Sequence, residues 1–259
     1  MSRVMRHFSQ VVLGAFLLAG PALAADPALV SAFGPGEQST FAVSYLGVPT
    51  GVAVITVGLK MTQYGKEVWP LVATAQTDLP IYPVRDRFVS YWDFTEGRNV
   101  GSDFHADENK KRRREKFRYD REQQKIFATK QAGGKPEVEL TYELQPGAVD
   151  LAAAAFTVRN RPLKVGDELA LPIFTGLITY QMKARVDGRE KRSTPMGEKD
   201  CLKVSFTADW AGMLTPKRAL TMWFTDDAAH VPVRFEAELM LGSVVAELKT
   251  FHPGKDYFR

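Results

Sequence analysis

"TFAVSYLGVPTGVAVITVGLK", residues 40 to 60, indicates the fold class of this protein. Its apolar residues alternate with small or polar ones or run together, and it is rich in Val, Ile, Tyr and Phe, as is typical of β-strands. Two such runs lie on either side of Val-Pro-Thr at 48–50. The stretch therefore predicts a β-hairpin whose connection lies at 48–50.

Similar runs recur to the end of the chain, separated by turn residues such as Gly133-Gly134 and Asp187-Gly188. Strands at roughly ten-residue spacing without alternating helices favour an all-β fold. We expect a curved antiparallel sheet, arranged as an open barrel or a sandwich. One segment, 150–159, predicts a short helix, because a capping Asp150 precedes four alanines and Pro162 follows.

The first residues predict export. Arg3 and Arg6 precede the apolar run 11–20, and Ala22 and Ala24 have the spacing of a signal-peptidase site. We therefore expect a signal peptide at 1–24, a flexible lead-in at 25–38 and a single β-rich domain at 39–259. The expected location of the mature protein is the periplasm.

Charge in this chain is concentrated in one place. Lys and Arg number 34 against 30 Asp and Glu, yet seven of these basic residues lie within 110–118, together with one acid, Glu115. Because the remainder is not basic, and because export removes the protein from nucleic acid, we expect no nucleic-acid partner.

The basic segment has the alternation of a strand. In an extended chain Lys110, Arg112, Arg114, Lys116 and Arg118 share one face, while Phe117 and Tyr119 occupy the other. Two interpretations stay open: a solvated strand face, or a ladder that contacts the anionic headgroups or phosphates of the envelope. The five cations are the candidate binding residues, since a face that only solubilises usually mixes charges of both signs.

No catalytic motif is present, and we expect no catalytic residue, metal or cofactor. Asp103, His105 and Asp107 alternate on one strand face and could hold a divalent ion, although a polar strand facing water explains them equally. Near residue 230, an Asp–His pair or a hairpin turn would account for the segment 226–230. The lone Cys201 is expected to be a buried apolar residue.

Four stretches carry a resemblance to known proteins: "YPVRDRFVSYWD" (82–93), "VDLAAAAFTVRNRPLKVGD" (149–167), "EKRSTPMGEKDCLKV" (190–204) and "LTMWFTDDAAHVPVRFEAELMLGSVVAEL" (220–248). Together they resemble an exported bacterial family, the domain of unknown function 3108 family. The likeness covers about residues 39 to 250. It implies a periplasmic, β-rich protein, and it transfers no activity and no catalytic residue.

These observations favour a non-enzymatic periplasmic protein that binds or carries an amphipathic, lipid-like envelope molecule. Export, the absence of catalytic motifs, the many aromatic residues on alternate strand positions and the cationic segment all point that way. The alternatives are a structural or interaction module of the envelope without a small ligand, and a hydrolase of an envelope polymer. An anionic membrane surface is an expected partner, and no partner protein is identified.

Overall fold

The computed structural model describes residues 31–77, 83–209, 220–239 and 242–255. The expected signal peptide therefore lies outside the described residues. Within them, no helical segment has the length and hydropathy needed to cross a membrane.

The described chain forms one antiparallel sheet and one helix, α2 (Leu151–Arg159). The strands are β1 Gln38–Tyr45, β2 Val48–Val57, β3 Met61–Gln63, β4 Lys66–Thr77, β5 Val84–Asp93, β6 Arg98–Glu108, β7 Lys111–Asp120, β8 Lys125–Ala132, β9 Val138–Glu143, β10 Glu168–Phe174, β11 Thr179–Thr194, β12 Gly197–Asp209, β13 Leu220–Thr225, β14 Pro232–Leu239 and β15 Gly242–His252. The expected fold class, a curved antiparallel sheet with one short helix, is confirmed.

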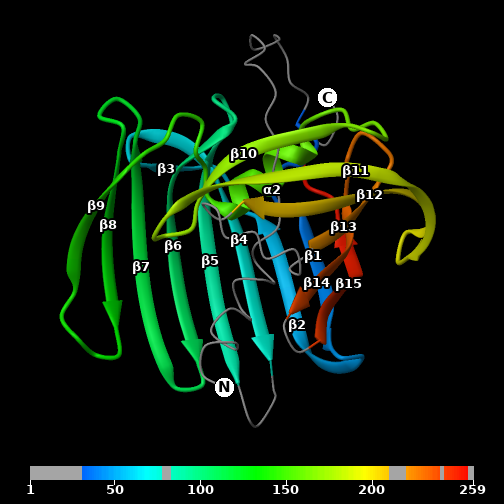
Figure 1. Ribbon diagram of the computed structural model, residues 1–259, viewed down its shortest axis with the longest axis horizontal. Helices are drawn as coiled ribbons and strands as arrows, with labels where there is room; N and C mark the ends of the chain where they lie inside the picture. The colour runs from blue at the N-terminus through cyan, green and yellow to red at the C-terminus, as the bar shows by residue number, and fades with distance from the viewer. Residues whose placement is uncertain (1–30, 78–82, 210–219, 240–241, 256–259) are drawn as a thin grey trace.

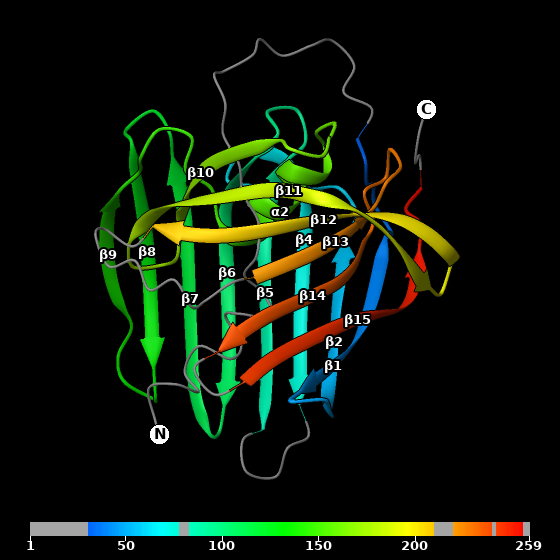
Figure 2. The same cartoon turned by 45° about the vertical axis from the view of Figure 1, so that its right-hand side comes forward.

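The topology is a meander that returns on itself. The strand order is β10-β11-β12-β13-β14-β15-β1-β2-β4-β5-β6-β7-β8-β9, with β3 paired only to β4. The last strand thus pairs with the first, and β9 and β10 are the two free edges. The sheet curls so that β10–β12 cross over β4–β6 at a steep angle, as both views show (Figures 1 and 2).

The first hairpin forms where alternation predicts it, but its turn lies elsewhere. Leu46 and Gly47 connect β1 to β2, and both have positive φ, 51° and 79°. Two consecutive positive φ values match the twist of a two-residue hairpin. The expected connection at 48–50 was wrong, because these residues belong to β2: Val48 and Pro49 pair with the end of β1, and Thr50 lies at a shift of register.

Helix α2 is capped as expected. Asp150 has an extended backbone and accepts a hydrogen bond from the backbone N of Ala153 at 2.8 Å. Ala153 and Ala154 are fully buried, and Phe156 is 4 % exposed. The helix packs between β10 and β4–β6, where its small residues allow close approach to the main core.

The described end of the expected lead-in is part of the core. Phe33 is 1 % exposed, and its ring meets Phe156 at 4.4 Å between centroids. Glu37 and Arg159, each 3 % exposed, form an ion pair at 2.6 Å. Residues 31–37 therefore anchor the chain to α2, which corrects the expectation of a loose segment there.

Candidate functional site: an outer cationic patch

Strand β7 has the two faces that its sequence predicts. Phe117 and Tyr119 are 4 % and 6 % exposed and pack against Phe174 of β10, with centroids 5.5 and 6.3 Å apart. The alternate residues of the same strand point outward. Those outward residues are Arg112, Arg114, Lys116 and Arg118.

Lys110 does not belong to this ladder. It occupies the β6–β7 turn with Asn109, and both have positive φ, 66° and 48°. The strand begins at Lys111. The expected five-residue ladder thus has four members, because the turn takes the first position out of the alternation.

Strand pairing adds residues that alternation within one segment does not reveal. Arg87 of β5 stands opposite His105 of β6, which stands opposite Arg114. Arg85 likewise lies in a row with Asp107 and Arg112. We name the resulting surface the outer cationic patch: Arg85, Arg87, His105, Arg112, Arg114, Lys116 and Arg118.

Two of these cations already have carboxylate partners. Arg112 Nε lies 3.1 Å from Asp107, and Arg118 lies 3.0 Å from Asp120 while stacking over Phe127 at 4.5 Å. In the part of the chain that the structure describes, no carboxylate lies within ion-pair distance of the other four. Those four are Arg85, Arg87, Arg114 and Lys116.

The patch is positive overall. Three carboxylates share its face, Asp103, Asp107 and Asp120, against six Arg and Lys residues. The net charge is therefore +3 with His105 neutral. Four of the positive groups are exposed and unpaired within the described chain, so they can reach an external anion without first breaking an internal ion pair.

Not all of the basic segment faces outward. Arg113 points to the inner face, lies 3.6 Å from Glu108 and stacks over Phe104 at 5.0 Å. Glu115 is on the same face, 3.9 Å from Lys130. These paired charges satisfy one another inside the curve of the sheet and do not contribute to the patch.

The strand face proposed for a metal is engaged in other contacts. Asp103 accepts a hydrogen bond from the Tyr91 hydroxyl at 3.1 Å, and Asp107 pairs with Arg112. Burial, with the charge of Asp103 beside it, raises the pKa of Tyr91 to about 12. Among the described residues, no three potential metal ligands converge.

The segment 226–230 is a hairpin connection between β13 and β14. Asp227 accepts hydrogen bonds from Thr225 Oγ1 at 2.8 Å and from the Ala229 N–H at 3.0 Å. His230 Nδ1 lies 3.1 Å from the Arg159 carbonyl oxygen, and burial lowers the pKa of its imidazole. The turn interpretation is confirmed, and these contacts are structural.

Cys201 is fully buried, as expected. Burial raises the pKa of its thiol to about 11, so the thiolate that nucleophilic chemistry needs is scarce at neutral pH.

Comparisons with known proteins agree with this fold. The sequence profile of a family described as a protein of unknown function, DUF3108, matches residues 40–249. No curated protein matches the sequence. A solved β-barrel-like protein of the domain of unknown function DUF1849, from Brucella abortus, is 8 % identical, with a TM-score of 0.57 over 86 % of this chain and 99 % of that one.

Two further solved structures are more distant in shape. A protein described as a candidate exported protein with a YmcC-like fold, from Bacteroides fragilis, has a TM-score of 0.33. A protein described as a candidate lipoprotein, from Parabacteroides distasonis, has a TM-score of 0.34. Each is 14 % identical, over 86 % of this chain and 99 % and 98 % of the respective partner chains. The β-barrel-like DUF1849 protein is thus the comparison that bears on the architecture.

Proposed function

The chain belongs to the DUF3108 family of proteins of unknown function, and from that premise we propose that it is an exported, non-enzymatic protein that docks on an anionic surface of the cell envelope. The outer cationic patch carries this proposal. The amino-terminal sequence supports export to the periplasm, and the lack of catalytic motifs supports a binding role.

The patch has the dimensions and charge of a surface-binding site. Arg112 and Arg118 are six residues apart, or about 20 Å, and the patch extends across three strands spaced about 4.8 Å apart. A cation next to an anionic leaflet contributes about 1 kcal/mol. Several exposed cations held rigidly by one sheet can therefore sustain reversible attachment to lipid headgroups.

The test uses sedimentation with vesicles. The variant Arg87→Ser/Arg114→Ser/Lys116→Ser removes three exposed cations that have no carboxylate partner among the described residues. We expect its affinity for vesicles rich in phosphatidylglycerol to fall by about a hundredfold at low salt, from about 1 kcal/mol per cation. Wild-type binding should weaken steeply as salt shortens the Debye length to about 8 Å near 0.15 M.

A charge-matched control separates the patch from overall charge. Lys164→Ser/Lys183→Ser/Arg185→Ser removes three exposed cations from β11 and the loop before β10. This variant should bind the vesicles almost as the wild type does. Equal losses in both triple variants, or wild-type binding to phosphatidylcholine vesicles as tight as to anionic ones, would reject the patch as the docking site.

A separate observation favours carriage of an amphipathic molecule as a second candidate. Exposed apolar side chains lie near both free sheet edges, Val138 and Leu140 on β9 and Leu177 and Ile178 in the β10–β11 turn. The two edge strands meet where Tyr142 of β9 packs against Phe174 of β10, 5.1 Å between ring centroids. Lys130, paired with Val138 across β8 and β9, donates to the Gly176 carbonyl oxygen and so links the two edges. An acyl chain could lie along these exposed apolar side chains with its headgroup near Lys130.

Mass spectrometry of molecules that co-purify with protein from its native periplasm tests carriage. A bound lipid, released from wild type and depleted in Leu140→Asp/Ile178→Asp, would support it. No lipid above the level on a control exported protein would exclude carriage and leave docking through the outer cationic patch as the function.

A further inference from the structure

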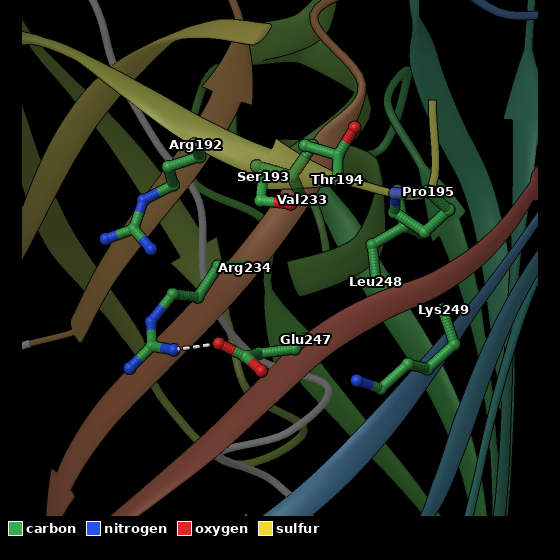
Figure 3. Close-up of a pocket in the computed structure, with 9 residues that line it drawn as sticks. All are labelled: Arg192, Ser193, Thr194, Pro195, Val233, Arg234, Glu247, Leu248 and Lys249. Carbon is green, nitrogen blue, oxygen red and sulfur yellow. Dashed lines mark hydrogen bonds and ion pairs between the residues drawn. The ribbon is translucent and has the colours of Figure 1, made fainter. Parts of the chain in front are cut away.

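A pocket of about 230 Å³ lies where the tip of the β11–β12 hairpin folds against β14 and β15 (Figure 3). The hairpin supplies one wall, and the two strands supply the other. The lining residues are Arg192, Ser193, Thr194, Pro195, Val233, Arg234, Glu247, Leu248 and Lys249.

Positive charge dominates the lining. Three cations, Arg192, Arg234 and Lys249, face a single carboxylate, Glu247, and Glu247 is joined to Arg234 (Figure 3). Two further carboxylates lie outside the lining: Glu190, 2.7 Å from Arg192, and Glu236, 2.9 Å from Arg234. Lys249 has no carboxylate partner in the part of the chain that the structure describes. The lining therefore carries a net charge of +2 and one unpaired ammonium group.

The ring of Trp223 contacts two of the cations that line the pocket, Arg192 and Arg234, and a third cation, Lys203. Arg192 stacks over its ring at 4.2 Å, Arg234 lies at 5.5 Å and Lys203 at 5.9 Å. Strand register enforces two of these contacts, because Trp223 stands directly opposite Lys203 on β12 and Arg234 on β14. The face of the indole ring attracts all three cations, and two of them, Arg192 and Arg234, also have carboxylate partners.

Hydrogen-bond donors here also lack acceptors. Trp223 is 5 % exposed, and its Nε1 is buried with no partner among the described residues. The Nε atoms of Arg192 and Arg234 are also buried and have no hydrogen-bond partner among the described residues. A buried donor without an acceptor is costly, so these three N–H groups would gain from acceptor oxygens supplied by a ligand.

We propose that this pocket binds the phosphate group of a small molecule. Phosphate supplies two negative charges and several acceptor oxygens, and guanidinium groups recognise it by paired hydrogen bonds. The volume is smaller than the roughly 300–1,000 Å³ of sites for drug-sized ligands but holds more than one water of about 30 Å³. Inorganic phosphate and a small phosphomonoester both match that space.

The site is independent of the outer cationic patch, which lies on β5–β7. The test follows the indole N–H signals of the full chain by NMR, with the Trp223 signal among the four tryptophans identified by Trp223→Phe. Inorganic phosphate, glycerol 3-phosphate and acetate are added separately at constant ionic strength, each to about 10 mM. We expect either phosphate compound to shift the Trp223 signal to saturation.

Variants then locate the binding. Lys249→Gln changes an exposed residue and should weaken phosphate binding at least tenfold, while Lys183→Gln, an exposed lysine of β11, should leave it unchanged. Tighter binding of glycerol 3-phosphate would identify an organic phosphate, and equal binding would identify free phosphate. An absent or unsaturable shift, acetate binding as tight as phosphate, or unchanged affinity in Lys249→Gln would each overturn the proposal.

Discussion

At the scale of single residues, hydrogen bonding and burial shift the pKa of Asp150 in opposite directions. Its carboxylate accepts hydrogen bonds from Ser90 Oγ at 2.7 Å, Asn99 Nδ2 at 2.8 Å and the Ala153 N–H at 2.8 Å, and these donors favour the charged form. Burial disfavours that form more strongly, and it raises the pKa of Asp150 to about 6 from an ordinary value of 3.8. The folded protein therefore holds this proton more tightly than the unfolded chain.

The sign of the pH effect follows from this shift. As pH rises from about 4 to about 6, unfolding releases the Asp150 proton, so the free energy of unfolding should fall by about 3 kcal/mol from this group. Asp150→Asn keeps a capping residue but cannot ionise. Urea unfolding at several pH values should show a smaller decline for the variant, and parallel curves for the two proteins would contradict the assignment.

At the scale of elements, α2 is defined by small residues. Four consecutive alanines give helix propensity, and the burial of Ala152, Ala153 and Ala154 allows the helix to lie close to β4–β6 and β10. A helix with larger side chains on this face would not fit into the same space, because protein interiors are close-packed.

Overpacking tests this contact. Ala153→Trp places a large ring at a fully buried position and should cost about 1–3 kcal/mol, seen as a lower melting temperature. Ala132→Trp, at an exposed end of β8, is the matched control and should melt close to wild type. A melting temperature for Ala153→Trp equal to that of the control would show that α2 does not pack against the sheet.

At the scale of the whole molecule, the segment before β1 connects distant parts of the fold. Phe33 contacts Phe156 of α2, Trp92 of β5 and Trp69 of β4, at centroid distances of 4.4, 6.0 and 6.1 Å. Arg159 adds hydrogen bonds to the carbonyl oxygens of Ala32 and Ala229. Removing this anchor should destabilise the whole sheet and not only its amino-terminal end.

Phe33→Ala should therefore lower the free energy of unfolding by about 3–5 kcal/mol, as for other large-to-small changes in a core. Leu59→Ala, at a residue that is 72 % exposed, should change it by less than about 0.5 kcal/mol. The measurement is the urea midpoint at constant slope. Similar midpoints for the two variants would show that Phe33 is not a core residue in solution.

Local sequence predicted part of the candidate site correctly. Alternation alone placed Arg112, Arg114, Lys116 and Arg118 outward and Phe117 inward, because side chains of a strand point to opposite faces. It failed for Lys110, since the turn chemistry of residues 109–110 interrupts the alternation.

By itself, the sequence determined the period-two strands, the capped alanine helix and the concentration of charge, because each follows from steric and hydrogen-bonding preferences within a few residues. Only the tertiary structure decided that β15 pairs with β1, that Arg87 joins Arg114 through His105, and that Arg192 lies over Trp223. These contacts join segments far apart in the chain. Strand order and sheet curvature set them, and these depend on how all the apolar faces are buried together.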